Sequence, residues 1–119
     1  LLIIISLGLL GAYHFGLTIP LSTVLHGLTI GGIGLMILAM ISRVSLGHTG
    51  RILQVGNWIV LGYAALAVSA IVRVIAPLIS NQPSSLYLIS IACWVFGYLA
   101  FIIIYWPVLT QPRIDGRPG

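Results

Sequence analysis

The feature that most constrains the fold is the segment of residues 26–51. It consists of an apolar run that ends near Arg43 and of the polar turn LGHTGR at residues 46–51. A helix of about 20 apolar residues is long enough to cross the hydrocarbon core of a bilayer. Only 5% of the 119 residues are charged and 60% are hydrophobic, whereas soluble domains carry about 25% charged residues. The sequence therefore predicts an integral membrane protein whose main partner is the lipid bilayer.

The rest of the chain divides into further apolar helices, so we predict an all-α, polytopic transmembrane bundle of about four spans. Prolines, glycines and polar turns place the helices at about residues 1–15, 20–46, 55–77 and 84–107. Pro77 is expected to loosen or end the third helix, and Pro107 to stop the fourth. Residues 1–110 then form the transmembrane region, and residues 111–119 a polar tail. The first helix is too short to span a bilayer and no signal peptide precedes it, so we expect a fragment of a larger bundle.

The positive charges of this chain predict its orientation. The chain has five arginines, no lysine and one acid, Asp115. Arg43 and Arg51 flank the LGHTGR turn, and Arg113 and Arg117 lie in the tail. These four arginines should share one boundary, which the positive-inside rule makes cytoplasmic together with the C-terminus. Because the arginines sit at helix ends, the net charge of +4 does not indicate a nucleic-acid partner.

One face of the second helix is smooth. At 100° per residue, Gly27, Gly31 and Gly34 fall within about 60° of each other, and Leu38 and Ser42 extend the stripe. Small residues at this spacing allow membrane helices to pack closely. The alternative is a flat slot for a planar cofactor.

Several residues are candidate metal ligands on their chemistry. His26 lies within a span, where an imidazole either hydrogen-bonds a neighbouring helix or binds a metal. His48 lies in a turn, where it is either solvated or a ligand. Met36 and Met40 either fill apolar space or bind copper(I) through their thioethers.

Arg73 is the one arginine expected inside the bundle. It shares a helix face with the small residues Gly62, Ala65, Ser69 and Ala76, which is the pattern of a packed face. It should lie at the depth of His26, about 10 Å inside the outer boundary. A guanidinium there needs a partner. It either snorkels to a lipid headgroup, or pairs with a cofactor carboxylate or with an acid outside this sequence.

Residues 26–51 resemble the NnrS family of bacterial membrane proteins. The matching features are HGLT at 26–29, the glycines at 31–34, MILAM at 36–40, Arg43, and LGHTGR at 46–51. The resemblance implies a multi-pass protein of the bacterial inner membrane with about twelve spans. It also implies an association with haem and copper and with the response to nitric oxide and nitrosative stress.

The resemblance implies roles for five residues. His26 and His48 are candidate metal ligands. They are expected on opposite sides of the membrane, so unless the second helix is broken they belong to two sites, or one is a ligand and the other is structural. Arg73, or the basic rim with Arg43 and Arg51, would pair with haem propionates. No catalytic residue is indicated, and whether a reaction is catalysed stays open. The alternatives are a transporter or channel fragment, and a small structural or assembly subunit that binds other membrane subunits.

Overall fold

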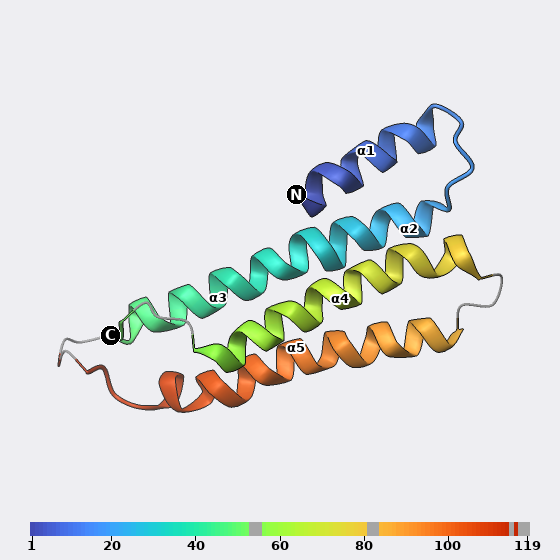
Figure 1. The fold of residues 1–119 in the computed structure, drawn as a ribbon. Helices are drawn as coiled ribbons and strands as arrows, with labels where there is room; N and C mark the ends of the chain where they lie inside the picture. Colours follow the sequence, from blue (N-terminus) through green and yellow to red (C-terminus); the bar gives the residue numbers. More distant parts are fainter. Residues whose placement is uncertain (53–55, 81–83, 115, 117–119) are drawn as a thin grey trace.

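The computed structural model describes residues 1–52, 56–80, 84–114 and 116, and every regular element within them is helical. Figure 1 shows the long helices side by side, with consecutive ones antiparallel. Three elements join end to end into one continuous helix, Leu21–His48. The elements are α1 (Leu2–His14), α2 (Leu21–His26), η1 (Gly27–Gly34), α3 (Leu35–His48), α4 (Asn57–Ile79) and α5 (Ser84–Thr110). The predicted all-α bundle is confirmed.

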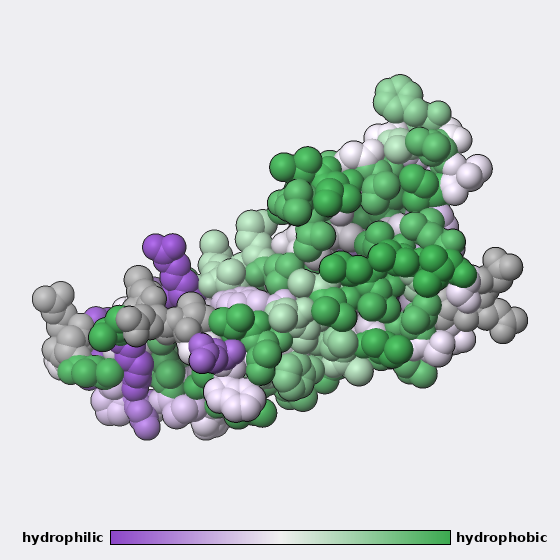
Figure 2. Space-filling model, in the orientation of Figure 1, coloured by the Kyte–Doolittle hydropathy of each residue, from purple (hydrophilic) through white to green (hydrophobic). Residues whose placement is uncertain are grey.

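The helices have the length and surface of membrane spans. In the part of the chain that the structure describes, three helices are long and apolar enough to cross a bilayer: Leu21–His48, α4 and α5. α1, with 13 residues, is shorter, as its sequence predicted. Figure 2 shows hydrophobic residues over most of the visible face and hydrophilic residues gathered at the end where α3 finishes. So large an apolar surface requires lipid contact, and the protein is a membrane protein.

The turn after α3 and the C-terminal segment lie at the same end of the bundle (Figure 1). The backbone N–H of Ile114 donates to the carbonyl of Thr49 at 3.3 Å. This contact confirms the predicted threading, in which the LGHTGR turn and Arg113 share one boundary. Residue 55, where the third helix was predicted to begin, residues 81–83 before the fourth helix, and Asp115 and Arg117 of the predicted tail lie outside the described residues.

Both prolines lie inside helices, so the prediction that Pro107 stops the fourth helix is wrong. α5 continues to Thr110, and α4 passes Pro77 to Ile79. A helical proline removes one donor and leaves one carbonyl free. The backbone recovers at once, because Ser80 N–H donates to the Ala76 carbonyl and Gln111 N–H to the Pro107 carbonyl, each at 3.2 Å. Each proline lies within a turn of its helix end, so the helix continues only briefly beyond it.

The glycine stripe is a packing face. Gly27, Gly31 and Gly34 are buried, as are Leu38 and Ser42 farther along the stripe. A Cβ at Gly27 would lie 2.7 Å from Ser6 Oγ of α1, and one at Gly31 would lie 3.1 Å from Ala70 Cβ of α4. Side chains of two neighbouring helices fill this face at Gly27 and Gly31, so close packing is confirmed there, whereas Gly34 lines the groove described below.

The sequence did not predict the π-helix η1 inside the long helix. A π-helix bonds i to i+5, forms wider turns than an α-helix, and is frequent at functional sites. Four of the eight residues of η1 are buried glycines, Gly27, Gly31, Gly32 and Gly34. Glycine lowers the preference of this segment for a regular α-helix. The contacts of η1 with α1 and α4 therefore decide its conformation. η1 also forms one wall of the groove described below.

α4 and α5 are joined by two close contacts. Gly62 and Gly97 face each other, and a Cβ at Gly97 would lie 2.9 Å from the Gly62 carbonyl oxygen. Farther along, Ser69 Oγ donates to the Ser90 carbonyl at 2.7 Å, and Ser90 Oγ donates to the Ser69 carbonyl at 2.9 Å. These reciprocal bonds satisfy two buried hydroxyls inside the membrane and fix the facing positions of the two helices.

Candidate functional site

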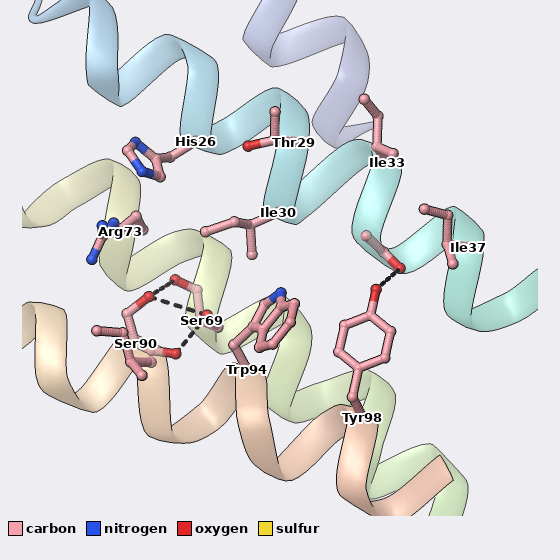
Figure 3. Close-up of a pocket in the computed structure, with 12 residues that line it drawn as sticks. His26, Thr29, Ile30, Ile33, Ile37, Ser69, Arg73, Ser90, Trp94 and Tyr98 are labelled. Carbon is pink, nitrogen blue, oxygen red and sulfur yellow. Dashed lines mark hydrogen bonds between the residues drawn. The ribbon is translucent and has the colours of Figure 1, made fainter. Parts of the chain in front are cut away.

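A groove of about 450 Å³ separates the long helix Leu21–His48 from α5, and α4 contributes to its floor (Figure 3). The volume is within the range of small-molecule and cofactor sites, about 300–1,000 Å³. Its walls are mainly apolar, with polar groups concentrated toward one end. The lining residues are His26, Thr29, Ile30, Ile33, Gly34, Ile37, Ser69, Arg73, Ser90, Ile91, Trp94 and Tyr98.

His26 is the imidazole of this groove. It is the last residue of α2 and is half-buried. Its Nδ1 is hydrogen-bonded to the carbonyl oxygen of Ser22, one turn earlier. A carbonyl only accepts, so Nδ1 carries the hydrogen and, in the neutral ring, Nε2 keeps its lone pair. The same arrangement, with one ring nitrogen donating to a carbonyl, orients most metal-binding histidines.

Arg73 lies beside His26, on α4 (Figure 3). Its guanidinium carbon is 4.2 Å from the centroid of the Tyr87 ring, a cation–π contact with α5. Its Nε is buried and has no hydrogen-bond partner among the residues that the structure describes. The prediction that Arg73 points into the bundle near His26 is confirmed, since both residues line the same groove.

Sequence reasoning missed the contribution of α5. Ser90, Trp94 and Tyr98 recur every fourth residue and form one wall of the groove. The Tyr98 hydroxyl donates to the carbonyl of Gly34 at 3.1 Å, which ties α5 to the end of η1. The Trp94 and Tyr98 rings contact each other, with centroids 4.7 Å apart. The signal available in the sequence was the spacing of these three residues, which puts one polar or aromatic side chain on each successive turn of an apolar helix.

The remaining candidate residues lie at the other end of the bundle. His48 ends α3, one helix with His26, and about 30 Å separates the two imidazoles along its axis. The structure therefore keeps them apart, as the sequence predicted. Arg43 and His48 line a separate hollow with Arg113. Arg51 is not in the groove of His26 either.

Arg51 holds the C-terminal segment in place. Its guanidinium donates to the Val108 carbonyl and to Gln111 Oε1, both at 3.0 Å.

Met36 and Met40, the copper(I) candidates, are 54% and 65% exposed on α3 and do not line the groove. Over the residues described, no three His, Cys, Asp or Glu side chains come together to hold a metal ion.

Replacing Arg51 with glutamine should release the C-terminal segment. Hydrogen bonds from a charged group contribute about 1.5–3 kcal/mol, so we expect amide exchange of residues 108–114 to accelerate at least about tenfold. Hydrogen–deuterium exchange of the full-length protein in detergent measures this effect. Arg73→Gln, which removes the same charge at the opposite end, should leave exchange of the segment unchanged. Unchanged exchange in Arg51→Gln would contradict the holding role.

Comparison with protein families gives a match over nearly the whole chain. The family model described as NnrS protein matches residues 1–113, nearly the whole chain. No curated protein and no solved structure matches this sequence.

Proposed function

Since the chain belongs to the NnrS family, we propose that it is part of a haem-binding membrane protein that acts in the response to nitric oxide. The proposed haem site is the groove between the long helix, α4 and α5. The observation that carries the proposal is the His26 imidazole, whose Nδ1 is bonded to the Ser22 carbonyl and whose ring lines this groove. His26 is the residue that would bind the haem iron.

The residues of the groove suit haem in three respects. A porphyrin brings four nitrogen ligands of its own, so one imidazole suffices where no cluster of protein ligands is found among the described residues. Ile30, Ile33, Ile91 and Trp94 offer apolar contacts to a flat macrocycle. Arg73, which lines the groove, offers the positive charge of its guanidinium to a propionate.

In this proposal each part of the groove has a task. His26, which the Ser22 carbonyl orients, would bind the iron. The isoleucines and Trp94 exclude water, and Arg73 neutralises carboxylate charge at a depth where an unpaired charge is costly. Bound haem would supply an iron that binds diatomic gases. Because the groove lies in the membrane-spanning part of the bundle, nitric oxide dissolved in lipid would reach it without crossing water.

The proposal extends to location and to copper. The family association and the shared boundary of Arg43, Arg51 and Arg113 support a bacterial inner-membrane protein with that boundary cytoplasmic. Copper would use a separate site, for which the Met36 and Met40 thioethers are the candidate ligands on this chain. Haem and copper analysis of the full-length protein purified in detergent tests both cofactors directly.

A bulky residue in the groove should block haem. Ile91 and Ile89 both lie on α5 and are 50% and 51% exposed, but only Ile91 lines the groove. We expect Ile91→Trp to lower the Soret absorbance per protein at least about fivefold, a loss of about 1 kcal/mol in binding. Ile89→Trp is the matched control and should retain full absorbance. Equal haem content in the two variants would place the haem elsewhere.

A further inference from the structure

Trp94 carries a hydrogen-bond donor that the protein itself does not use. Its indole ring projects from α5 toward the long helix, and the ring nitrogen lies on the edge turned toward Ile30 (Figure 3). No hydrogen bond from this nitrogen is found within the described residues, and the ring contact of Trp94 is with Tyr98. The side chain lines the groove and is 41% exposed. Its N–H therefore faces the space that a ligand would fill.

The other neutral donors of the groove are committed to backbone carbonyls. Each hydroxyl on the walls donates within the protein: Thr29 to Leu25 at 2.8 Å, Ser69 to Ser90 at 2.7 Å, Ser90 to Ser69 at 2.9 Å, and Tyr98 to Gly34 at 3.1 Å. The Nδ1 hydrogen of His26 goes to the Ser22 carbonyl. An indole nitrogen can only donate. Among the described lining residues, Trp94 is thus the neutral donor that remains for a ligand.

Trp94 lies on the wall of the groove opposite His26. His26 belongs to the long helix and Trp94 to α5, and these two helices run in the same direction (Figure 1). Tyr98 bonds to Gly34, so Trp94 and Ile30, each four residues earlier, lie at one depth. His26 is one further turn away, about 6 Å along the axis. This offset is smaller than the width of a porphyrin, so one flat molecule can meet both side chains.

We propose that the Trp94 N–H donates a hydrogen bond to the small ligand that the haem iron binds on the side of α5. The inference rests on the proposed function, in which His26 binds the iron from the long helix. A flat molecule held by His26 turns its other face toward α5, where Ile91 and Trp94 lie. Hydrogen-bond donors and polarity on that side decide which diatomic gases a haem binds. A single donor among isoleucines would stabilise a diatomic ligand with partial negative charge on its outer atom.

The experiment uses carbon monoxide as the probe and the reduced, haem-loaded, full-length protein in detergent. A hydrogen bond to the oxygen of bound carbon monoxide draws electron density into its antibonding orbital and lowers its stretching frequency. Trp94→Phe keeps an aromatic ring and removes the N–H, so we expect the infrared band to move to higher frequency. The frequency belongs to each bound molecule and does not depend on how much haem the variant retains.

Two further variants and one solvent change complete the test. Trp106→Phe removes an indole N–H from the part of α5 outside the groove and should leave the band in place. Tyr98→Phe removes a hydroxyl that is already bonded to Gly34 and should move the band less than Trp94→Phe does. In D₂O the band of the unaltered protein should shift slightly, because the N–H becomes N–D. This last measurement needs no variant to fold.

The inference is overturned by an unchanged band in Trp94→Phe, or by an unaltered protein whose band is the same in water and in D₂O. An equal shift in Tyr98→Phe would also overturn it, because the cause would then be packing of the two rings. Haem content separates this failure from that of the proposed function. If Ile91→Trp retains its haem, the site itself is wrong and the role of Trp94 is lost with it. If Ile91→Trp loses haem while Trp94→Phe keeps the original band, only the role of Trp94 is refuted.

Discussion

His26→Ala is expected to lower the haem content of the full-length protein at least about tenfold, the loss typical when the support of a metal site is removed. His26 is the imidazole that lines the groove, and its Nδ1 bond to the Ser22 carbonyl leaves Nε2 for iron. The measurement is the Soret absorbance and the pyridine haemochrome of the purified protein, each per mole of protein. Addition of imidazole should restore part of the absorbance if the vacated position is the axial one.

Three control variants isolate the role of His26. Ser22→Ala keeps the backbone carbonyl that accepts the Nδ1 hydrogen, so haem content should not change. His14→Ala removes an exposed imidazole from the end of α1. His48→Ala removes the imidazole at the other boundary, and a loss of haem there would identify a second site. Full haem content in His26→Ala would refute its assignment as the axial ligand.

Gly97→Val should have the largest effect on stability. Any Cβ at Gly97 would collide with Leu66 Cδ1 and lie 2.9 Å from the Gly62 carbonyl oxygen. The leucine can change rotamer, but the backbone of α4 cannot move without separating the two helices. Overpacking of this kind costs about 1–3 kcal/mol and sometimes more. We expect a clear fall in the thermal midpoint of the full-length protein. Size-exclusion chromatography of heated samples measures this midpoint.

The control for this variant is Gly8→Val. Gly8 is also a helical glycine, but a Cβ there meets nothing within 4 Å. It should leave the midpoint nearly unchanged, so the difference between the two variants measures the α4–α5 contact. Similar midpoints for the two variants would mean that the close approach of Gly62 and Gly97 contributes little to stability.

Much of this fold was predictable because membrane helices follow simple rules. The apolar runs predicted the membrane spans, and the arginines at 43, 51 and 113 predicted that the turn after α3 and the C-terminal segment share one boundary. The glycine stripe of the long helix gave its packed face. Arg73 could be placed beside His26 by depth alone, since antiparallel helices of known rise bring residues near the same boundary together.

The parts that could not be predicted depend on tertiary contacts. Pro107 lies inside α5 because the single hydrogen bond that it removes does not prevent the last three residues from continuing the helix. One wall of the groove is formed by α5. The sequence of α5 alone does not show which of its faces contacts α4. The reciprocal bonds of Ser69 and Ser90 settle that face in the structure.

The π-helical turns between His26 and Leu35 bear on how this chain tolerates change in length. An i to i+5 turn holds about one residue more than an i to i+4 turn. Loss of one residue from Gly27–Gly34 can therefore be absorbed by tightening to α geometry, with the flanking segments kept in phase. α4 has no π-helical turn that could absorb the same deletion. Loss of one residue there would rotate the rest of the helix by about 100° relative to its neighbours.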